Sequence, residues 1–173
     1  FNGNYALYFT WWDKWMGTEF KDYETRHEQI FKRKNIKKTS EGLYSLTVAD
    51  IRHEANEAFT IQFGDVPTIF RDFWAGQHLT IKVNIKGETL YRTFSISSIP
   101  NKDNFLTLTI KKIKGGKVTN YLAENIKVGD TLEVTAPSGQ FYLNTEPANQ
   151  KHYAMIAGGS GITPIYSMIG TIL

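Results

Sequence analysis

The chain has 173 residues, of which 41% are hydrophobic and 21% charged, with a formal net charge of +3 at pH 7. This composition is that of a globular protein with one domain or one domain plus short additions, and the small net charge does not favour nucleic-acid binding. It contains no cysteine, which excludes disulfides, a thiolate nucleophile and cysteine-ligated zinc or iron–sulfur clusters within these residues. No apolar run reaches membrane-spanning length, and the N-terminus is not a signal peptide.

The first segment, residues 1–20, is rich in aromatic residues. Their helical spacing predicts an N-terminal helix with one aromatic face, and the charged pair Asp13 and Lys14 argues against a bilayer-spanning role. Such a helix packs on a neighbouring domain or lies in a membrane interface. Because the first residue is Phe1 rather than methionine, we expect the chain to be a piece of a longer protein.

Residues 21–41 are polar and contain several lysines and arginines. We interpret this segment as a linker. Its basic side chains suit either plain solvation or a place beside anionic lipid on the cytoplasmic side of a membrane.

From residue 42 to residue 150 the pattern is mainly β and predicts a six-stranded antiparallel Greek-key barrel with one helix. Lys86-Gly87 suits a tight hairpin, and Pro137-Ser138-Gly139 suits a turn from which residues 140–143 extend. The helix has Thr119 as its expected N-cap and ends before Val128. The expected strands, which carry alternating or β-branched residues, are Leu43–Ile51, Ala58–Phe63, Leu79–Ile85, Thr89–Ser97, Phe105–Ile113 and Thr131–Thr135.

The stretch Leu90–Pro100 combines a cation, an aromatic ring and several hydroxyls on one extended segment. Strand alternation places Arg92 and Phe94 on one face, with Thr93 and Ser95 on the other. An arginine fork suits a pyrophosphate and a ring can cover a flat heterocycle, so this set could bind a flavin nucleotide. An ordinary barrel strand with a surface arginine explains the same residues equally well.

Residues 115–119, Gly-Gly-Lys-Val-Thr, precede the predicted helix. The glycines permit close backbone approach, and the helix start offers free N–H groups to a phosphate. A simple glycine hairpin loop is the alternative.

Beyond residue 150 the pattern changes to a buried, parallel strand, Tyr153–Ala157, followed by a glycine-rich loop, Gly158–Pro164. Thr163 and Pro164 then occupy the expected N-cap and first helical position, and Ile165, Met168, Ile169 and Ile172 form one apolar helix face. Strand, glycine loop and helix start together favour a dinucleotide pyrophosphate site.

Residues 42–173 resemble the ferredoxin–NADP reductase superfamily, in particular the reductase components of bacterial oxygenases. Ala75-Gly76-Gln77-His78 resembles the family's Pro-Gly-Gln-aromatic turn, and Arg92-Thr93-Phe94-Ser95 its Arg-x-Tyr-Ser flavin motif. Gly116-Lys117-Val118-Thr119 resembles its second phosphate motif, while residues 129–130 and 137–141 fit its barrel strands and residues 158–164 its nicotinamide-nucleotide loop. Phe94 departs from the family's tyrosine, and Ala75 from its proline.

The resemblance implies FAD and NAD(P)H as cofactors and an iron centre as electron acceptor. Arg92 would hold the FAD pyrophosphate, Phe94 would stack on the flavin and Ser95 would reach its N5 atom. Ser95 and Thr163 are the expected catalytic residues, no metal ligand is expected, and all four histidines are interpreted as structural or surface residues. The expected cofactor-binding residues are Arg92, Thr93, Phe94, Ser95, Ile110, Lys111, Gly116, Lys117, Val118, Thr119, Gly158, Gly159, Gly161, Thr163 and Pro164.

A second resemblance concerns residues 1–18, in which Phe-Asn-Gly-Asn-Tyr-Ala and Trp-Trp-Asp-Lys-Trp-Met-Gly-Thr are similar to the C-terminal end of the fatty acid hydroxylase and sterol desaturase family. Combined, the two resemblances imply a parent protein that joins a membrane di-iron hydroxylase to its own reductase. The parent would be membrane-associated on the cytoplasmic side, whereas the piece itself would be soluble. Residues 151–173 would be only the start of the NAD(P)-binding domain. The resemblance also allows a 2Fe–2S domain elsewhere in the parent protein.

Two alternatives remain open from the sequence. The chain could belong to a soluble reductase subunit that serves a separate oxygenase, or it could be a barrel used for protein interaction that has lost its flavin site. We expect the piece as given to bind FAD weakly or variably and not to turn over NAD(P)H, because a lone strand–helix unit cannot form a parallel sheet. The choice of NADH or NADPH, the hydroxylase substrate and the oligomeric state are not readable from the sequence.

Overall fold

The computed structural model describes residues 38–54, 57–64, 66–146, 148 and 150–173. The predicted aromatic helix of residues 1–20 and nearly all of the predicted linker, residues 21–41, lie outside the described residues.

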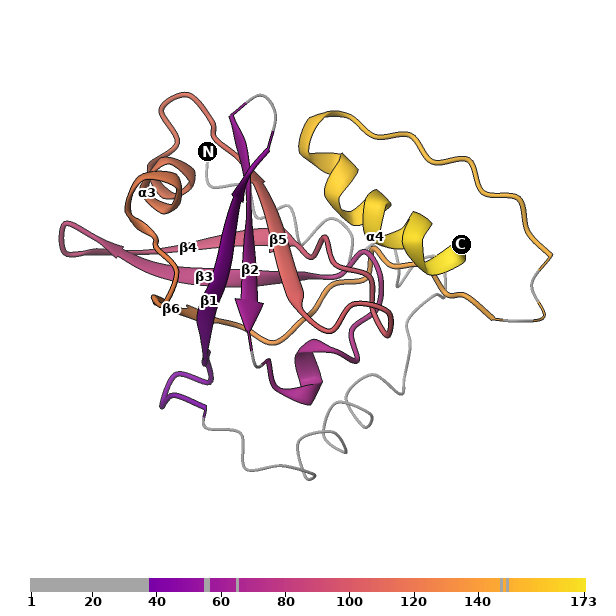
Figure 1. The fold of residues 1–173 in the computed structure, drawn as a ribbon, viewed down its shortest axis with the longest axis horizontal. Coiled ribbons are helices and arrows are strands. Elements are labelled where there is room, and N and C mark those ends of the chain that lie inside the picture. Colours follow the sequence, from indigo (N-terminus) through magenta and orange to yellow (C-terminus); the bar gives the residue numbers. More distant parts are fainter. Residues whose placement is uncertain (1–37, 55–56, 65, 147, 149) are drawn as a thin grey trace, which may run out of the picture.

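One curled sheet of six antiparallel strands forms the body of the protein, in the order β4-β3-β6-β1-β2-β5 (Figure 1). The two outer strands, β4 and β5, come near each other, so the sheet curls into a half-barrel. The mainly β prediction is therefore confirmed, and every strand predicted for the barrel is present with its ends displaced by at most a residue or two. The strands are β1 (Tyr44–His53), β2 (Ala58–Gly64), β3 (His78–Ile85), β4 (Glu88–Ser95), β5 (Leu106–Lys111) and β6 (Thr131–Val134).

The core fills the concave side of this sheet because alternate strand residues point inward. Ile61 and Phe63 on β2, Ile81 on β3 and Leu108 on β5 are all completely buried. Each such side chain contributes about 1.5–3 kcal/mol through removal from water.

The predicted hairpin at Lys86-Gly87 joins β3 to β4 through a two-residue turn, since Ile85 pairs directly with Glu88. Both turn residues have positive φ, 53° for Lys86 and 85° for Gly87, as a type I′ turn requires. The Asn84 carboxamide oxygen accepts a hydrogen bond from the Gly87 amide at 3.0 Å. This turn sets the register of the whole β3–β4 ladder.

In the described part of the chain, four helical segments accompany the sheet: η1 (Thr68–Phe70), α3 (Lys117–Asn125), η2 (Gly159–Gly161) and α4 (Ile162–Ile172). Figure 1 shows α3 on the side of the β3–β4 hairpin and α4 at the other end of the half-barrel. Among the described residues, no helix has the length and apolar character needed to cross a bilayer.

The predicted strand Tyr153–Ala157 does not form, and the segment is largely exposed, with Ile156 93% accessible. A parallel strand depends on hydrogen bonds to neighbours, and none of the strands in the described part of the chain lies beside it. Residues 140–143 likewise have no regular structure.

The apolar face predicted for α4 is only half correct. Ile165 and Met168 are buried against the barrel, whereas Ile169 and Ile172 are 39% and 41% exposed. The polar Thr163 and Ser167 take part in the buried face instead, so the helix is rotated relative to the purely apolar stripe.

Candidate functional site

Arg92 and Phe94 lie on the same face of β4, in agreement with strand alternation. They stand opposite Ile81 and Leu79 of β3, which are core residues. The Phe94 ring is half-buried against the core, while Arg92 is exposed. The result is a fixed aromatic surface with an exposed cation two residues away.

Thr93 and Ser95 occupy the opposite face of β4. The Thr93 hydroxyl is 2.9 Å from the Thr80 hydroxyl, and Ser95 pairs across the ladder with His78. Because β4 is the last strand of the sheet, its outer edge carries backbone groups that no strand among the described residues uses. A ligand along this edge can contact side chains from both faces.

His78, for which the sequence predicts a structural or surface role, lies beside Ser95. Burial lowers the pKa of its imidazole, because a less hydrated ring is harder to charge. The ring's Nε2 atom is 3.5 Å from the Ser138 hydroxyl. The two-residue hairpin already fixes this neighbourhood, since counting back from the turn pairs His78 with Ser95.

The start of α3 is the second part of the site, and here the predicted cap is wrong. The helix begins at Lys117 with Gly116 as N-cap, because the Gly116 carbonyl already accepts from the Asn120 amide at 3.3 Å. Thr119 therefore lies inside the first turn, 4% exposed, and its hydroxyl accepts from the Ile113 amide at 3.3 Å. No side chain caps this helix start. Its first amides point out of the helix.

The backbone of Gly116 does not require glycine, since its φ of −73° suits any residue. Glycine is required at this position because there is no room for a side chain. A Cβ at this position would lie 2.6 Å from the Thr119 hydroxyl oxygen and 3.1 Å from the Ile113 carbonyl oxygen. A larger residue would therefore displace the Thr119 hydrogen bond and the first turn of α3.

Lys117 connects the two parts of the site. Its amine is 3.1 Å from the Glu88 carboxylate at the start of β4, so the open helix start and β4 lie on the same side of the barrel. Lys111, another predicted cofactor contact, is exposed at the end of β5, whereas the Ile110 side chain is in the core. The Val118 side chain is also buried. Contacts from Ile110 and Val118 to a ligand would have to come from their backbone groups.

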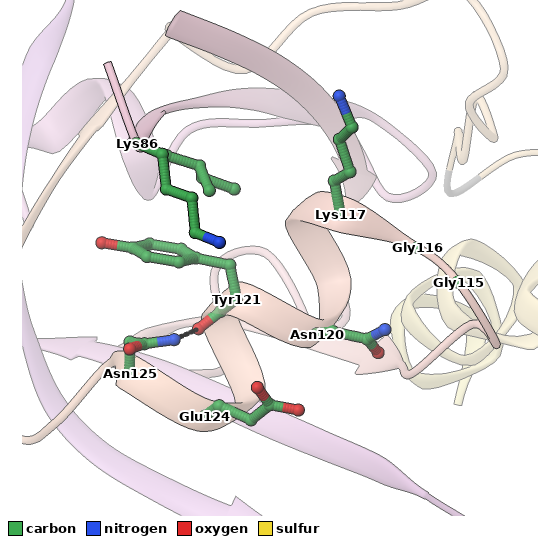
Figure 2. A pocket seen from close by; sticks show the side chains of 9 residues that line it. Lys86, Gly115, Gly116, Lys117, Asn120, Tyr121, Glu124 and Asn125 are labelled. Carbon is green, nitrogen blue, oxygen red and sulfur yellow. Dashed lines mark hydrogen bonds between the residues drawn. The ribbon is translucent and has the colours of Figure 1, made fainter. Parts of the chain in front are cut away.

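A groove of about 510 Å³ extends from the helix start along α3 toward the β3–β4 hairpin. Figure 2 shows Lys86 of the hairpin reaching over the Tyr121 ring on α3, with the Asn125 carboxamide bonded to the Tyr121 carbonyl at 2.9 Å. The groove is therefore lined by Gly115 and Gly116 at the helix start and by the Tyr121 ring further along α3.

The glycine loop, residues 158–164, forms the third part. The loop makes the 3₁₀ turn η2 and passes directly into α4, so the predicted N-cap Thr163 is the second residue of the helix and Pro164 the third. The Thr163 hydroxyl donates to the Ser160 carbonyl at 2.8 Å, which holds the loop on the helix. Gly158, Gly159 and Gly161 have open space where a Cβ would stand.

Helix α4, which follows the loop, is attached to the segment that follows the flavin-type motif. The Ser167 hydroxyl donates to the Ser98 carbonyl at 2.6 Å, and the Lys102 amine donates to the Gly170 carbonyl at 2.8 Å. Ser98 lies three residues beyond the end of β4. Among the described residues, no group of three or more histidines and carboxylates is placed to hold a metal ion.

Comparison with known proteins places this geometry in a family. Residues 56–142 match the family model described as the oxidoreductase FAD-binding domain. The chain is 41% identical over 135 residues to one of the subunits of 1,2-phenylacetyl-CoA epoxidase from Escherichia coli K12, a match that covers 75% of the chain and 37% of the relative.

Two solved structures have the same fold. The FAD/NAD-binding domain of nitric oxide dioxygenase from Vibrio cholerae superposes with a TM-score of 0.64 at 25% identity, covering 74% of this chain and 56% of that domain. Phthalate dioxygenase reductase, described as transferring electrons from pyridine nucleotides to a [2Fe–2S] centre, superposes with a TM-score of 0.62 at 26% identity, covering 75% and 39%. The chain thus spans well under two thirds of these relatives.

Proposed function

Because this chain belongs to the oxidoreductase FAD-binding domain family, we propose that it is the flavin module of a reductase that passes electrons from NAD(P)H to the iron centre of an oxygenase or hydroxylase. The observation that carries the proposal is the Lys117–Glu88 contact, which places the open start of α3 beside β4. In the proposed complex a pyrophosphate would be bound by the helix amides and by Arg92, with Phe94 two residues further along the strand.

The residues present fit FAD by their chemistry. Arg92 would hold the pyrophosphate with its paired N–H donors, and the half-buried Phe94 ring would support the flat heterocycle. The Ser95 hydroxyl would exchange a hydrogen bond with a ring nitrogen. Since the Thr119 hydroxyl is engaged by the Ile113 amide, Thr119 would offer its backbone N–H to the phosphates.

Bound FAD would supply the chemistry of accepting a hydride and releasing single electrons. The chain's part is to bind, orient and exclude water. Gly158, Gly159 and Gly161 would let the NAD(P)H pyrophosphate approach the backbone at the start of α4, and Thr163 and Pro164 would border the nicotinamide.

The finer proposal concerns the whole protein. The resemblance of residues 1–18 to a hydroxylase tail supports a parent in which hydroxylase and reductase are fused, which would raise the effective concentration of reductase at the iron site. The parent would then be held at the cytoplasmic side of a membrane. A full-length sequence without a histidine cluster before Phe1 would contradict the fusion.

A second candidate is a reductase subunit that serves a separate oxygenase. It is favoured by the relative from Escherichia coli, which is named as one subunit of an epoxidase. A parent that needs detergent for extraction supports the fusion, and one that purifies without detergent supports the separate subunit.

The test of the flavin site is the visible spectrum of the purified chain after addition of FAD and gel filtration. Because this piece is expected to bind FAD weakly, we expect only part of the flavin bands to co-elute with the protein. Arg92→Ala should weaken FAD binding about 10- to 150-fold, which corresponds to the loss of charge-assisted hydrogen bonds worth about 1.5–3 kcal/mol.

The matched control is Arg71→Ala, since Arg71 is an exposed arginine at the end of η1. Its affinity for FAD should equal that of the unsubstituted chain. A chain that stays colourless with FAD, or equal losses in both variants, would leave the non-catalytic interaction barrel as the better explanation.

A further inference from the structure

Helix α4 is attached to the segment that follows β4, and the attachment is polar at its centre. Ser167 is completely buried, and its hydroxyl donates to the carbonyl of Ser98, which is 2% exposed, at 2.6 Å. One turn further on, Gly170 packs so closely on Ile99 that a Cβ would collide with the Ile99 side chain. The interface therefore has one hydrogen-bonded point and one point of close contact.

The Ser167 hydrogen bond is unusual for a serine inside a helix. Such hydroxyls commonly bond a carbonyl of their own helix, as the Thr171 hydroxyl does with the Ser167 carbonyl at 2.8 Å. Ser167 instead contacts a residue 69 positions away in the sequence. A buried hydroxyl has to be paired, so this bond holds α4 in one position on the barrel.

The acceptor segment is itself fixed to β5. The Ser97 amide donates to the Thr107 carbonyl at 2.9 Å, and the Thr107 amide donates to the Ser98 hydroxyl at 3.2 Å. The Ser97 and Thr107 hydroxyls are also 3.0 Å apart. Ser98, three residues beyond Ser95, is therefore a rigid reference point.

The glycine loop has no comparable anchor among the described residues. Its glycines meet no atom within 4 Å at the Cβ position, and the preceding residues 153–157 are largely exposed. The loop is held to α4 by the Thr163–Ser160 hydrogen bond. Where α4 sits on the barrel therefore decides where the loop sits.

We propose that Ser167 is a positioning residue, whose hydrogen bond to Ser98 sets the distance between the loop Gly158–Thr163 and the end of β4 at Ser95. The proposal rests on the function proposed above, in which the loop holds NAD(P)H and Ser95 faces the flavin. Ser167 would contact neither NAD(P)H nor the flavin. It would act on the loop through α4 and on the end of β4 through Ser98.

The test compares Ser167→Ala with Thr171→Val in the FAD-loaded full-length parent protein, because the 173-residue piece by itself is not expected to turn over NAD(P)H. The second variant also loses a hydroxyl of α4, but one that bonds within the helix. One readout is amide exchange in residues 158–163. The other is anaerobic flavin bleaching after mixing with NADH or NADPH, which separates the limiting rate from the half-saturating concentration.

We expect Ser167→Ala to speed loop exchange and to lower the limiting rate about 10-fold, with half-saturation changed less than about twofold, because misplacement affects the reacting geometry more than binding. Thr171→Val should match the parent. Gly170→Ala, which presses α4 away from Ile99 while keeping Ser167, should shift both readouts in the direction of Ser167→Ala.

Unchanged loop exchange in Ser167→Ala, or a rate and half-saturation that change together, would overturn the positioning role. If the unsubstituted protein binds FAD but neither nucleotide bleaches it, the proposed electron transfer fails instead, and amide exchange alone decides the role of Ser167.

Discussion

The half-barrel and the C-terminal unit respond differently to the same kind of sequence pattern. In the half-barrel every predicted strand forms, because each has a hydrogen-bonded neighbour within the chain. In residues 151–173 the helix forms and the strand before it does not. A helix satisfies its backbone hydrogen bonds internally, whereas a strand forms only where neighbouring strands supply its hydrogen-bond partners. Periodicity thus predicts helices more independently of context than it predicts parallel strands.

The largest expected difference between the half-barrel and residues 151–173 is in the rate of amide hydrogen exchange. The amides of β2, which pairs with β1 and β5, should exchange only through global unfolding, about 10³-fold or more slowly than those of Tyr153–Ala157. Exchange measured by mass spectrometry or NMR checks this. Comparable protection in both segments would show that Tyr153–Ala157 has strand partners after all.

The next effect is on stability. Phe63→Ala should lower the free energy of unfolding by about 3–5 kcal/mol, because Phe63 is completely buried on β2 and its loss leaves a cavity. Ile156→Ala, at a position 93% exposed, should stay within about 0.5 kcal/mol of the parent. Denaturant titration gives both values, and a large cost at Ile156 would break the distinction between the two regions.

The smallest effect is the pH dependence that His78 of the barrel contributes to stability. Since burial lowers the pKa of His78, its contribution to stability is complete above the ordinary histidine pKa of about 6.5 and is lost as pH falls through the lowered value. His78→Gln should flatten the fall in stability below that pH, as measured by denaturant titration at a series of pH values. His152→Gln, at an exposed position, is the control and should leave the profile unchanged.

Much of the fold follows from local patterns. The two-residue turn at Lys86-Gly87 determines the β3–β4 register, and with it the β3 residues that pair with Arg92 and Thr93. The predicted helix starts are wrong because Thr119 and Thr163 are good caps by residue type, whereas preceding glycines let both helices begin earlier. Hydrogen bonds between residues far apart in the sequence cannot be predicted from local patterns: nothing around Ser167 indicates that its hydroxyl donates to the Ser98 carbonyl.

The site is partly readable in the same sense. Residue chemistry makes the Arg92–Ser95 motif and the start of α3 candidates, and the family resemblance favours the flavin interpretation of both. The Lys117–Glu88 contact joins the start of α3 to the start of β4. The roles assigned to individual residues stay predictions. The Ile110 side chain lies in the core, so the contact that the resemblance implies for this residue would have to come from its backbone groups.

Positions 87 and 116 are both glycine, but for different structural reasons. The two positions should therefore differ in the substitutions that they tolerate. At Gly87 the constraint is handedness, so a D-alanine or an asparagine meets it and the position tolerates such replacements. At Gly116 the backbone angles are ordinary and the constraint is room beside the Thr119 hydroxyl, which any L-residue would occupy with its Cβ. In a saturation library, position 87 would accept the few residues that tolerate a positive φ, whereas position 116 would accept only glycine.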